Sequence, residues 1–271
     1  MDPLINIAVS AARNAGAVIT RAMNRLDTIK VETKRHNDFV SEIDRQSEEV
    51  IIETIRKAHP DHAILAEESG HQGGGEYEWI IDPLDGTTNY LHGFPVFAVS
   101  IAVTVRGRLT HGVVYDPLRE EMFIASRGQG ALLNERRMRV TSLRGLEGAL
   151  IGTGFPFRDF RDLASYLAML RAVLEKSGGV RRAGAAALDL AWVASGRLDG
   201  FFELGLKIWD IAAGCLLIEE SGGIVGDVTG KSGWPVAGGH ILTGSPRVFM
   251  ALARALAPHL PPELLNPAIK K

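Results

Sequence analysis

Apolar residues near the start of the chain recur every three to four positions, which is the spacing of one helix face. This pattern predicts a helix over residues 4–23, with Asp2 as its N-cap. A second helix is predicted over residues 42–58, because Ser41 can cap it and Asp44 follows three positions later. The chain therefore opens with two amphipathic helices.

Runs rich in β-branched and aromatic residues then replace the helical spacing. Turn residues separate these runs, which is typical of an antiparallel meander. The predicted strands of this meander are residues 96–105, 109–115 and 121–125. Two shorter strand-like runs precede it, at residues 63–66 and 77–81, and the glycine-rich segment 71–75 between them is predicted to be a loop.

Helices and strands alternate after about residue 140. Strands are predicted near residues 149–152, 179–182, 198–203, 224–227 and 240–243. Helices are predicted over residues 159–174, 186–194 and 210–220, with a last helix opening at Ser245. We therefore expect an α+β protein with an N-terminal half over residues 1–140 and a C-terminal half over residues 141–271.

Composition narrows the class of protein. The 271 residues are 46% hydrophobic and 23% charged, and 30 basic against 32 acidic residues leave a formal charge of −2. No overall basic excess indicates a nucleic acid or membrane partner, although a local basic patch stays possible. The single cysteine excludes an intramolecular disulfide, and we see neither a signal peptide nor a membrane-spanning run. A soluble, cytoplasmic protein is expected.

Acidic residues stand where predicted strands end or helices begin. They are Glu67, Glu68, Asp82, Asp85, Glu203 and Asp210. Each alone is explained by a solvated loop, a turn or a helix start. Together they adjoin apolar core segments with no basic cluster nearby, and such carboxylates are costly to bury unless they are paired or bind a metal. Hard oxygen donors suit Mg²⁺ or Mn²⁺, and no HxxxH or CxxC spacing indicates a zinc site.

Three segments carrying these acids resemble the signatures of the inositol monophosphatase family. They are residues 66–69 (AEES), 79–90 (WIIDPLDGTTNY) and 209–214 (WDIAAG), in the family's order and spacing. Residues 184–190 (GAAALDL) and 196–203 (GRLDGFFE) most resemble the bacterial SuhB-type branch. The resemblance implies a layered α-β-α-β-α sandwich, in which an antiparallel sheet with helices is followed by a second, mixed sheet with helices. It also implies a homodimer.

The resemblance assigns the metal ligands by position. Glu67, Asp82 and the backbone carbonyl of Leu84 would hold the first Mg²⁺. Asp82, Asp85 and Asp210 would hold the second, so that Asp82 bridges the two. The four carboxylates carry four negative charges, which two Mg²⁺ ions would balance.

The remaining roles also follow from the resemblance. Thr87 and Glu67 would position the metal-activated water, and the backbone N–H groups of Gly86 and Thr87 would face the phosphate. Asp85, the backbone of Ala186 and Glu203 would bind polyol hydroxyls. Lys34 and Asp44 resemble residues of a mobile loop, here residues 34–40, that shapes a third and weaker metal site.

The leading hypothesis is therefore a Mg²⁺-dependent, Li⁺-sensitive phosphomonoesterase acting on inositol monophosphate and related polyol phosphates. Lys207 makes the rim more basic than in animal members of the family, and it bears on substrate choice. The alternative is a regulatory role, because bacterial members that this chain resembles are associated with RNA polymerase and transcription antitermination. Arginines outside the site are either the binding surface for that role or a solvated basic face: Arg136, Arg137, Arg139, Arg144, Arg158, Arg161, Arg181 and Arg182.

Overall fold

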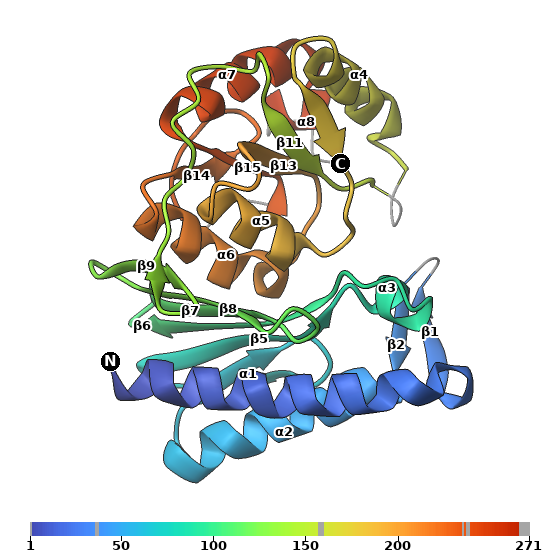
Figure 1. The fold of residues 1–271 in the computed structure, drawn as a ribbon, viewed down its shortest axis with the longest axis vertical. Coiled ribbons are helices and arrows are strands. Elements are labelled where there is room, and N and C mark those ends of the chain that lie inside the picture. The colour runs from blue at the N-terminus through green and yellow to red at the C-terminus, as the bar shows by residue number, and fades with distance from the viewer. Residues whose placement is uncertain (1, 36–37, 157–159, 235, 237–238, 266–271) are drawn as a thin grey trace.

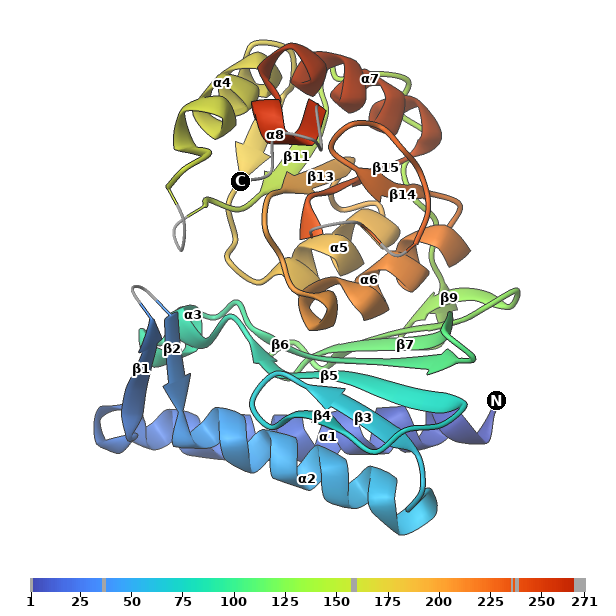
Figure 2. The same cartoon turned by 180° about the vertical axis from the view of Figure 1, so that it is seen from behind.

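The fold is known from a computed structural model that describes residues 2–35, 38–156, 160–234, 236 and 239–265. Five layers follow one another through the molecule (Figure 1). Helices α1 (Pro3–Ala22) and α2 (Glu42–Ala58) cover one face of an eight-stranded sheet. Helices α5 (Ala186–Ala194) and α6 (Ile208–Glu220) separate that sheet from a five-stranded sheet. Helices α4 (Leu163–Leu174) and α7 (Pro246–Leu256) form the last layer, as the view from behind also shows (Figure 2). The predicted α-β-α-β-α sandwich is confirmed.

The first two helices begin where the capping residues predict. The Asp2 carboxylate accepts a 2.8 Å hydrogen bond from the Leu4 N–H, and the Ser41 hydroxyl accepts from the Ile43 and Asp44 N–H groups. These side chains satisfy backbone donors that have no partner inside the helix. A short 3₁₀ helix, η1 (Met23–Thr28), follows α1.

The eight-stranded sheet has the order β10-β9-β8-β7-β6-β5-β3-β4. All its neighbouring strands are antiparallel except β3 and β5, which are parallel. Its strands are β3 (Ala63–Ala66), β4 (Gly70–Gln72), β5 (Tyr77–Asp85), β6 (Ala98–Val105), β7 (Arg108–Asp116), β8 (Glu121–Ser126), β9 (Gly130–Leu133) and β10 (Arg136–Arg137). The short strands β4, β9 and β10 were not predicted, and β4 takes up part of the predicted loop 71–75.

The five-stranded sheet has the order β12-β11-β13-β15-β14. It is mixed, as predicted, because β11 pairs in parallel with β12 and β13 while β15 pairs antiparallel with β13 and β14. Its strands are β11 (Leu150–Thr153), β12 (Gly179–Arg181), β13 (Gly200–Glu203), β14 (Ile224–Asp227) and β15 (Ile241–Gly244). The chain ends in η3 (Ala257–His259) and α8 (Pro262–Leu265).

The middle helices join the two halves in one core. A side chain at Gly112 of β7 would meet the Ala213 carbonyl oxygen of α6 at 2.9 Å, so the glycine lets that helix lie directly on the sheet. Ile80 of β5, Leu190 of α5 and Leu216 of α6 belong to one buried apolar cluster. The predicted division at 140/141 falls between β10 and β11, across this shared core.

The predicted loop 34–40 is largely a strand pair. β1 (Val31–Arg35) and β2 (Asp38–Ser41) form a separate antiparallel two-stranded sheet, with Val31 opposite Ser41. Local pairing satisfies the backbone groups of a segment whose composition gave no strand signal. Within the described residues, none of the helices combines the length and the apolarity that crossing a bilayer requires.

Candidate active site

Parallel pairing of β3 and β5 brings the first two carboxylates together. Ala66 lies opposite Ile81 in the register, so Glu67 and Asp82 leave the same edge of the sheet at the same level. The Glu67 N–H donates a 3.1 Å hydrogen bond to the Ile81 carbonyl and continues the ladder by one step. Asp82 is only 1% exposed at this edge.

An irregularity in β5 places Asp85 on the same face as Asp82. Residues three apart in a regular strand point to opposite faces. Here Asp82 lies opposite Ser100 and Asp85 opposite Ala98, two residues apart on β6, so the strand carries an extra residue between the two acids. Pro83 fits in this bulge because it has no N–H to donate, and the Asp82 Oδ1 accepts the Leu84 N–H at 3.0 Å.

The first turn of α6 supplies Asp210. The Lys207 N–H donates a 2.7 Å hydrogen bond to Asp210 Oδ2, which holds the carboxylate at the helix start. The Ser100 hydroxyl donates to the Trp209 carbonyl at 3.2 Å and fixes this turn against β6 beside Asp82. Lys207 itself is exposed, as expected for a rim residue.

The electrostatics show that four predicted metal-ligating carboxylates form one group. Burial raises the pKa of Asp82 well above its usual value, and the charges of Glu67, Asp85 and Asp210 raise it further. Burial and then the Asp210 charge raise the pKa of Asp85 to about 8, against hydrogen bonds from the Ala187 and Ala186 N–H groups that lower it. The charges of Glu67, Asp85 and Asp210 all disfavour ionisation of Asp82, so these carboxylates repel one another when they are charged.

The α2 helix reaches the site through Asp44. Its Oδ1 accepts a 2.8 Å hydrogen bond from the Thr87 hydroxyl, while Oδ2 accepts the Ser41 N–H at 2.8 Å. The Thr87 oxygen also lies 3.1 Å from the Leu84 carbonyl oxygen, the predicted backbone metal ligand. Asp44 thus connects a helix cap to the residue predicted to position water. Lys34 lies in β1, and its side chain is outside the described residues.

Gly86 is required between the strand and the short helix α3 (Thr87–Leu91). Its φ of 93° lies in the left-handed region. A Cβ there would meet the Val96 carbonyl oxygen at 2.9 Å and the Ala185 Cβ at 3.3 Å. The backbone predicted to face the phosphate is therefore closely enclosed by both halves of the molecule.

The α5 helix and β13 supply the predicted substrate contacts. Ala186 is the first residue of α5, and the Ala187 N–H beside it donates a 2.7 Å hydrogen bond to Asp85 Oδ2. Glu203 ends β13, and its carboxylate occupies the space that a side chain at Gly154 would need. The Asn89 side chain joins the two halves here by donating to the carbonyls of Val96 and Ala183.

Two further carboxylates belong to the surroundings of the site and were missed from sequence. Glu48 of α2, 3% exposed, accepts the N–H groups of Glu68 and Ser69 and so fixes the turn that carries Glu67. Asp189 of α5 is 1% exposed; burial raises its pKa well above the usual value, and Glu203 and Asp85 raise it further. Helical spacing placed both in amphipathic helices, and nothing local distinguished them from surface acids.

The donor set fits a hard divalent cation. Over the described part of the chain, no three His, Cys, Asp or Glu side chains stand together as a ready-made metal cage. The buried Asp82 nevertheless shares its surroundings with three other carboxylates whose charges raise its pKa, and a bound cation would offset this repulsion. Carboxylate and carbonyl oxygens are the donors that Mg²⁺ and Mn²⁺ prefer.

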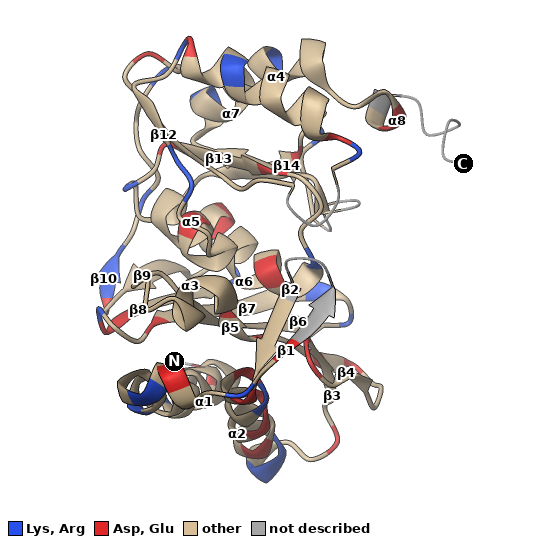
Figure 3. Cartoon of the chain, turned by 90° about the vertical axis from the view of Figure 1, so that its right-hand side faces the viewer, with Lys and Arg blue, Asp and Glu red and all other residues tan. Residues whose placement is uncertain are grey.

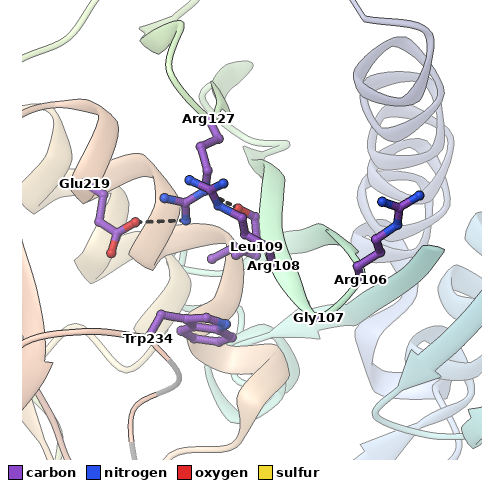
Figure 4. A pocket seen from close by; sticks show the side chains of 7 residues that line it. All are labelled: Arg106, Gly107, Arg108, Leu109, Arg127, Glu219 and Trp234. Atoms are coloured by element: carbon purple, nitrogen blue, oxygen red, sulfur yellow. Dashed lines mark hydrogen bonds and ion pairs between the residues drawn. The ribbon is translucent and has the colours of Figure 1, made fainter. Parts of the chain in front are cut away.

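A separate cavity lies near the turn between β6 and β7, away from these carboxylates (Figure 4). It has a volume of about 330 Å³ and is lined by Trp234, Leu109 and arginines of two turns. Arg127 donates to Glu219 at 3.1 Å across its wall. No residue predicted for catalysis lines it.

The layered fold and the grouped carboxylates define a class of α+β sandwiches with a candidate metal site, and comparison with known proteins gives the family. A model of the inositol monophosphatase family matches residues 1–261, and the chain belongs to this family. It is 54% identical over 270 residues to Nus factor SuhB of Pseudomonas aeruginosa, covering 97% of this chain and 99% of that protein. It is 49% identical over 254 residues to Nus factor SuhB of Escherichia coli K12, covering 93% and 95%.

Solved structures agree with this assignment. The crystal structure of extragenic suppressor protein SuhB from Bartonella henselae superposes with a TM-score of 0.92 at 42% identity, covering 96% of this chain and 100% of that one. The inositol monophosphatase from Anabaena superposes with a TM-score of 0.84 at 39% identity, covering 96% and 98%. The resemblance predicted from sequence, including the SuhB-type branch, is confirmed.

Proposed function

We propose that this protein is a Mg²⁺-dependent phosphomonoesterase that hydrolyses inositol monophosphate and related small polyol phosphates. One observation carries the proposal: Asp82 is buried among Glu67, Asp85 and Asp210, and burial and then their negative charges raise its pKa. Such a group is costly to keep unless a cation binds there, and an uncatalysed phosphate ester is hydrolysed extremely slowly. Membership of the inositol monophosphatase family agrees with this reaction.

The site would hold two Mg²⁺ ions, or three, and Mn²⁺ is a possible substitute. Glu67, Asp82 and the Leu84 carbonyl would bind the first, and Asp82, Asp85 and Asp210 the second. When bound, such ions supply Lewis acidity that activates water and stabilises the leaving oxygen. Li⁺ at the second position would bring too little charge for that stabilisation, so we expect Li⁺ to inhibit.

The protein's own groups would orient the attacking water. The Thr87 hydroxyl has one proton, which either the Leu84 carbonyl or the Asp44 carboxylate can accept. If the Leu84 carbonyl is engaged as a ligand, the Thr87 hydroxyl donates its hydrogen bond to the Asp44 carboxylate instead. The Thr87 oxygen then accepts a hydrogen bond from the water, and Glu67 accepts the second. Asp44 acts here as a positioning residue and, with Lys34, would shape the weaker third ion site.

Substrate recognition would come from both halves of the molecule. The N–H groups of Gly86 and Thr87 would bind phosphate oxygens, and Asp85, the Ala186 backbone and Glu203 would bind the polyol hydroxyls. A site whose carboxylates accept hydrogen bonds from substrate hydroxyls discriminates strongly against substrates without those hydroxyls, because the carboxylates are then left unpaired. We therefore expect polyol phosphates to be preferred over simple aryl phosphates.

The test is phosphate release from inositol 1-phosphate while Mg²⁺ is titrated from zero, with and without Li⁺. Asp85→Asn should lose activity by at least about a hundredfold while the fold stays intact. Asp61→Asn, an exposed change of the same kind, is the matched control. Full activity in Asp85→Asn would contradict the second metal position, and a stronger preference for a nucleotide phosphate would contradict the substrate class.

A second candidate function is favoured by the relatives named Nus factor SuhB in Pseudomonas aeruginosa and Escherichia coli. In this case the protein, expected to be a cytoplasmic homodimer, would act with RNA polymerase in transcription antitermination, and catalysis would be secondary. Complementation separates the two functions. If Asp85→Asn restores growth to a deletion strain, the regulatory role is supported; if only the active enzyme does so, the phosphatase role is.

A further inference from the structure

A second cavity, of about 500 Å³, lies where the edge of the eight-stranded sheet meets the end of α5. Arg136 and Arg137 of β10 line it together with Arg139, and Ser195 closes it on the helix side. β10 is the edge strand of its sheet and shows as a band of basic residues at the border of the molecule (Figure 3). No residue of the candidate active site lines this cavity.

The charges of this cavity are not balanced. Its one acidic lining residue, Glu121, is bound by both terminal nitrogens of Arg197, at 2.5 Å each, and Arg197 keeps the pKa of Glu121 below its usual range. Arg136, Arg137 and Arg139 have no carboxylate partner among the described residues. Three exposed guanidinium groups therefore surround the cavity without a counter-charge.

Two of these arginines are held in place without being neutralised. Arg137 donates a 2.9 Å hydrogen bond to the Gln129 carbonyl, and Arg139 donates a 3.0 Å hydrogen bond to the Met138 carbonyl. Backbone carbonyls restrict the side chains but leave their positive charges and further donors available. Such pre-ordering lowers the entropy that a bound anion must overcome.

We propose that this cavity, lined by Arg136, Arg137 and Arg139, is a docking site for an acidic segment of a partner protein. The Arg197–Glu121 pair at its rim shows the fork-like carboxylate binding that the free arginines can repeat. Leu133 and Met138 add apolar lining that suits the side chains of a peptide. The site is independent of the proposed phosphatase activity.

The same observations disfavour nucleic acid as the occupant. Among the described residues, no aromatic side chain on which a base could stack lines the cavity. The chain as a whole carries a formal charge of −2, so it lacks the long-range attraction that draws a polyanion to a protein. An acidic peptide needs only the local charge of the arginines.

The test is fluorescence anisotropy with a labelled peptide rich in Glu with interspersed Leu, compared with a labelled single-stranded RNA of equal charge. Arg136→Gln is the first variant, since the exposed Arg136 side chain makes no hydrogen bond or ion pair with another described residue and we expect its loss to leave the fold intact. It should weaken peptide binding by about threefold to tenfold, and Arg136→Gln with Arg137→Gln by more than about tenfold.

Arg106→Gln with Arg108→Gln is the matched control, because it removes the same charge at the other cavity (Figure 4). Peptide binding that is lost in the first pair and kept in the control, with unchanged phosphate release in both, supports the proposal. Equal loss in both pairs would show unspecific charge attraction and overturn it. Absence of peptide binding, or RNA binding that depends on Arg136, would overturn it as well.

Discussion

The backbone N–H of Ala187 donates a 2.7 Å hydrogen bond to Oδ2 of Asp85, a residue 102 positions earlier in the chain. The donor is the second residue of α5 in the C-terminal half, and the acceptor ends β5 of the N-terminal half. This contact orients the Asp85 carboxylate from the C-terminal half. The candidate site is thus assembled across the two halves, as the Ser100–Trp209 hydrogen bond also indicates.

The raised pKa of Asp85, about 8, predicts how pH acts on the metal-free protein. Between pH 4 and 8, the folded protein keeps a proton on Asp85 that the unfolded chain has released. The free energy of unfolding therefore falls as pH rises through this window. Calorimetry in the presence of a chelator should show an unfolding temperature that decreases from pH 5 to 8, and less steeply so in Asp85→Asn.

Mg²⁺ should reverse this dependence, because bound ligands must be deprotonated. Its stabilising effect should grow with pH up to about 8, with protons released on binding that a pH indicator can count. An unfolding temperature that rises with pH in the chelated protein, or an equal slope in Asp85→Asn, would contradict the grouping of the carboxylates.

Alanine substitutions at Gly86 and Gly107 distinguish the stability cost of backbone strain from the stability cost of a steric clash. Both have positive φ, 93° and 73°, but a Cβ at Gly107 would meet nothing within 4 Å, whereas at Gly86 it would meet the Val96 carbonyl oxygen at 2.9 Å. Gly107→Ala should cost about 1 kcal/mol. Gly86→Ala should cost about 2–3 kcal/mol and also lower kcat, measured by denaturant unfolding and phosphate release. Equal stability of the two variants would show that the contact at Gly86 is relieved by movement.

The positions of the long helices could be predicted because their signals are local. Asp2 and Ser41 cap the helices that their sequences indicate, and the apolar spacing carries through α1 and α2. The strands β4, β9 and β10 could not, since their sequences (GHQ, GALL and RR) contain no β-branched residue and no Phe, Tyr or Trp. Their strand geometry comes from pairing with neighbours.

The candidate site divides in the same way. Glu67, Asp82, Asp85 and Asp210 were predicted because their motifs resemble those of a family, and in the structure the charges of the other three act on Asp82. Glu48 and Asp189 could not be found, because their importance depends on distant contacts with the Glu68 turn and with Glu203. The bulge after Asp82 is likewise invisible locally, although Pro83 is compatible with it.

Glu48 should control activity without touching substrate. Its carboxylate accepts the Glu68 and Ser69 N–H groups at 2.9 and 2.8 Å. Glu48→Gln can satisfy only one of them, so we expect a loss of about 1–3 kcal/mol in stability. Half-maximal activity should also need a higher Mg²⁺ concentration, because the turn that carries Glu67 is loosened. The exposed Glu49→Gln is the control, and an unchanged Mg²⁺ curve in Glu48→Gln would limit its role to stability.

Substitutions of Thr87 test whether its hydroxyl, which lies between Asp44 and the Leu84 carbonyl, orients the attacking water. Thr87→Val keeps the shape of the side chain but removes the group that donates to Asp44 at 2.8 Å, and it should lower kcat by about a hundredfold or more with little change in KM. Thr87→Ser retains the hydroxyl and should keep most of the activity. Asp44→Asn preserves an acceptor for Thr87 and should fall between the two, because the Ser41 N–H also depends on this side chain. If Thr87→Val and Thr87→Ser lose activity equally, the side chain serves packing at the start of α3, and the water must be oriented by Glu67 alone.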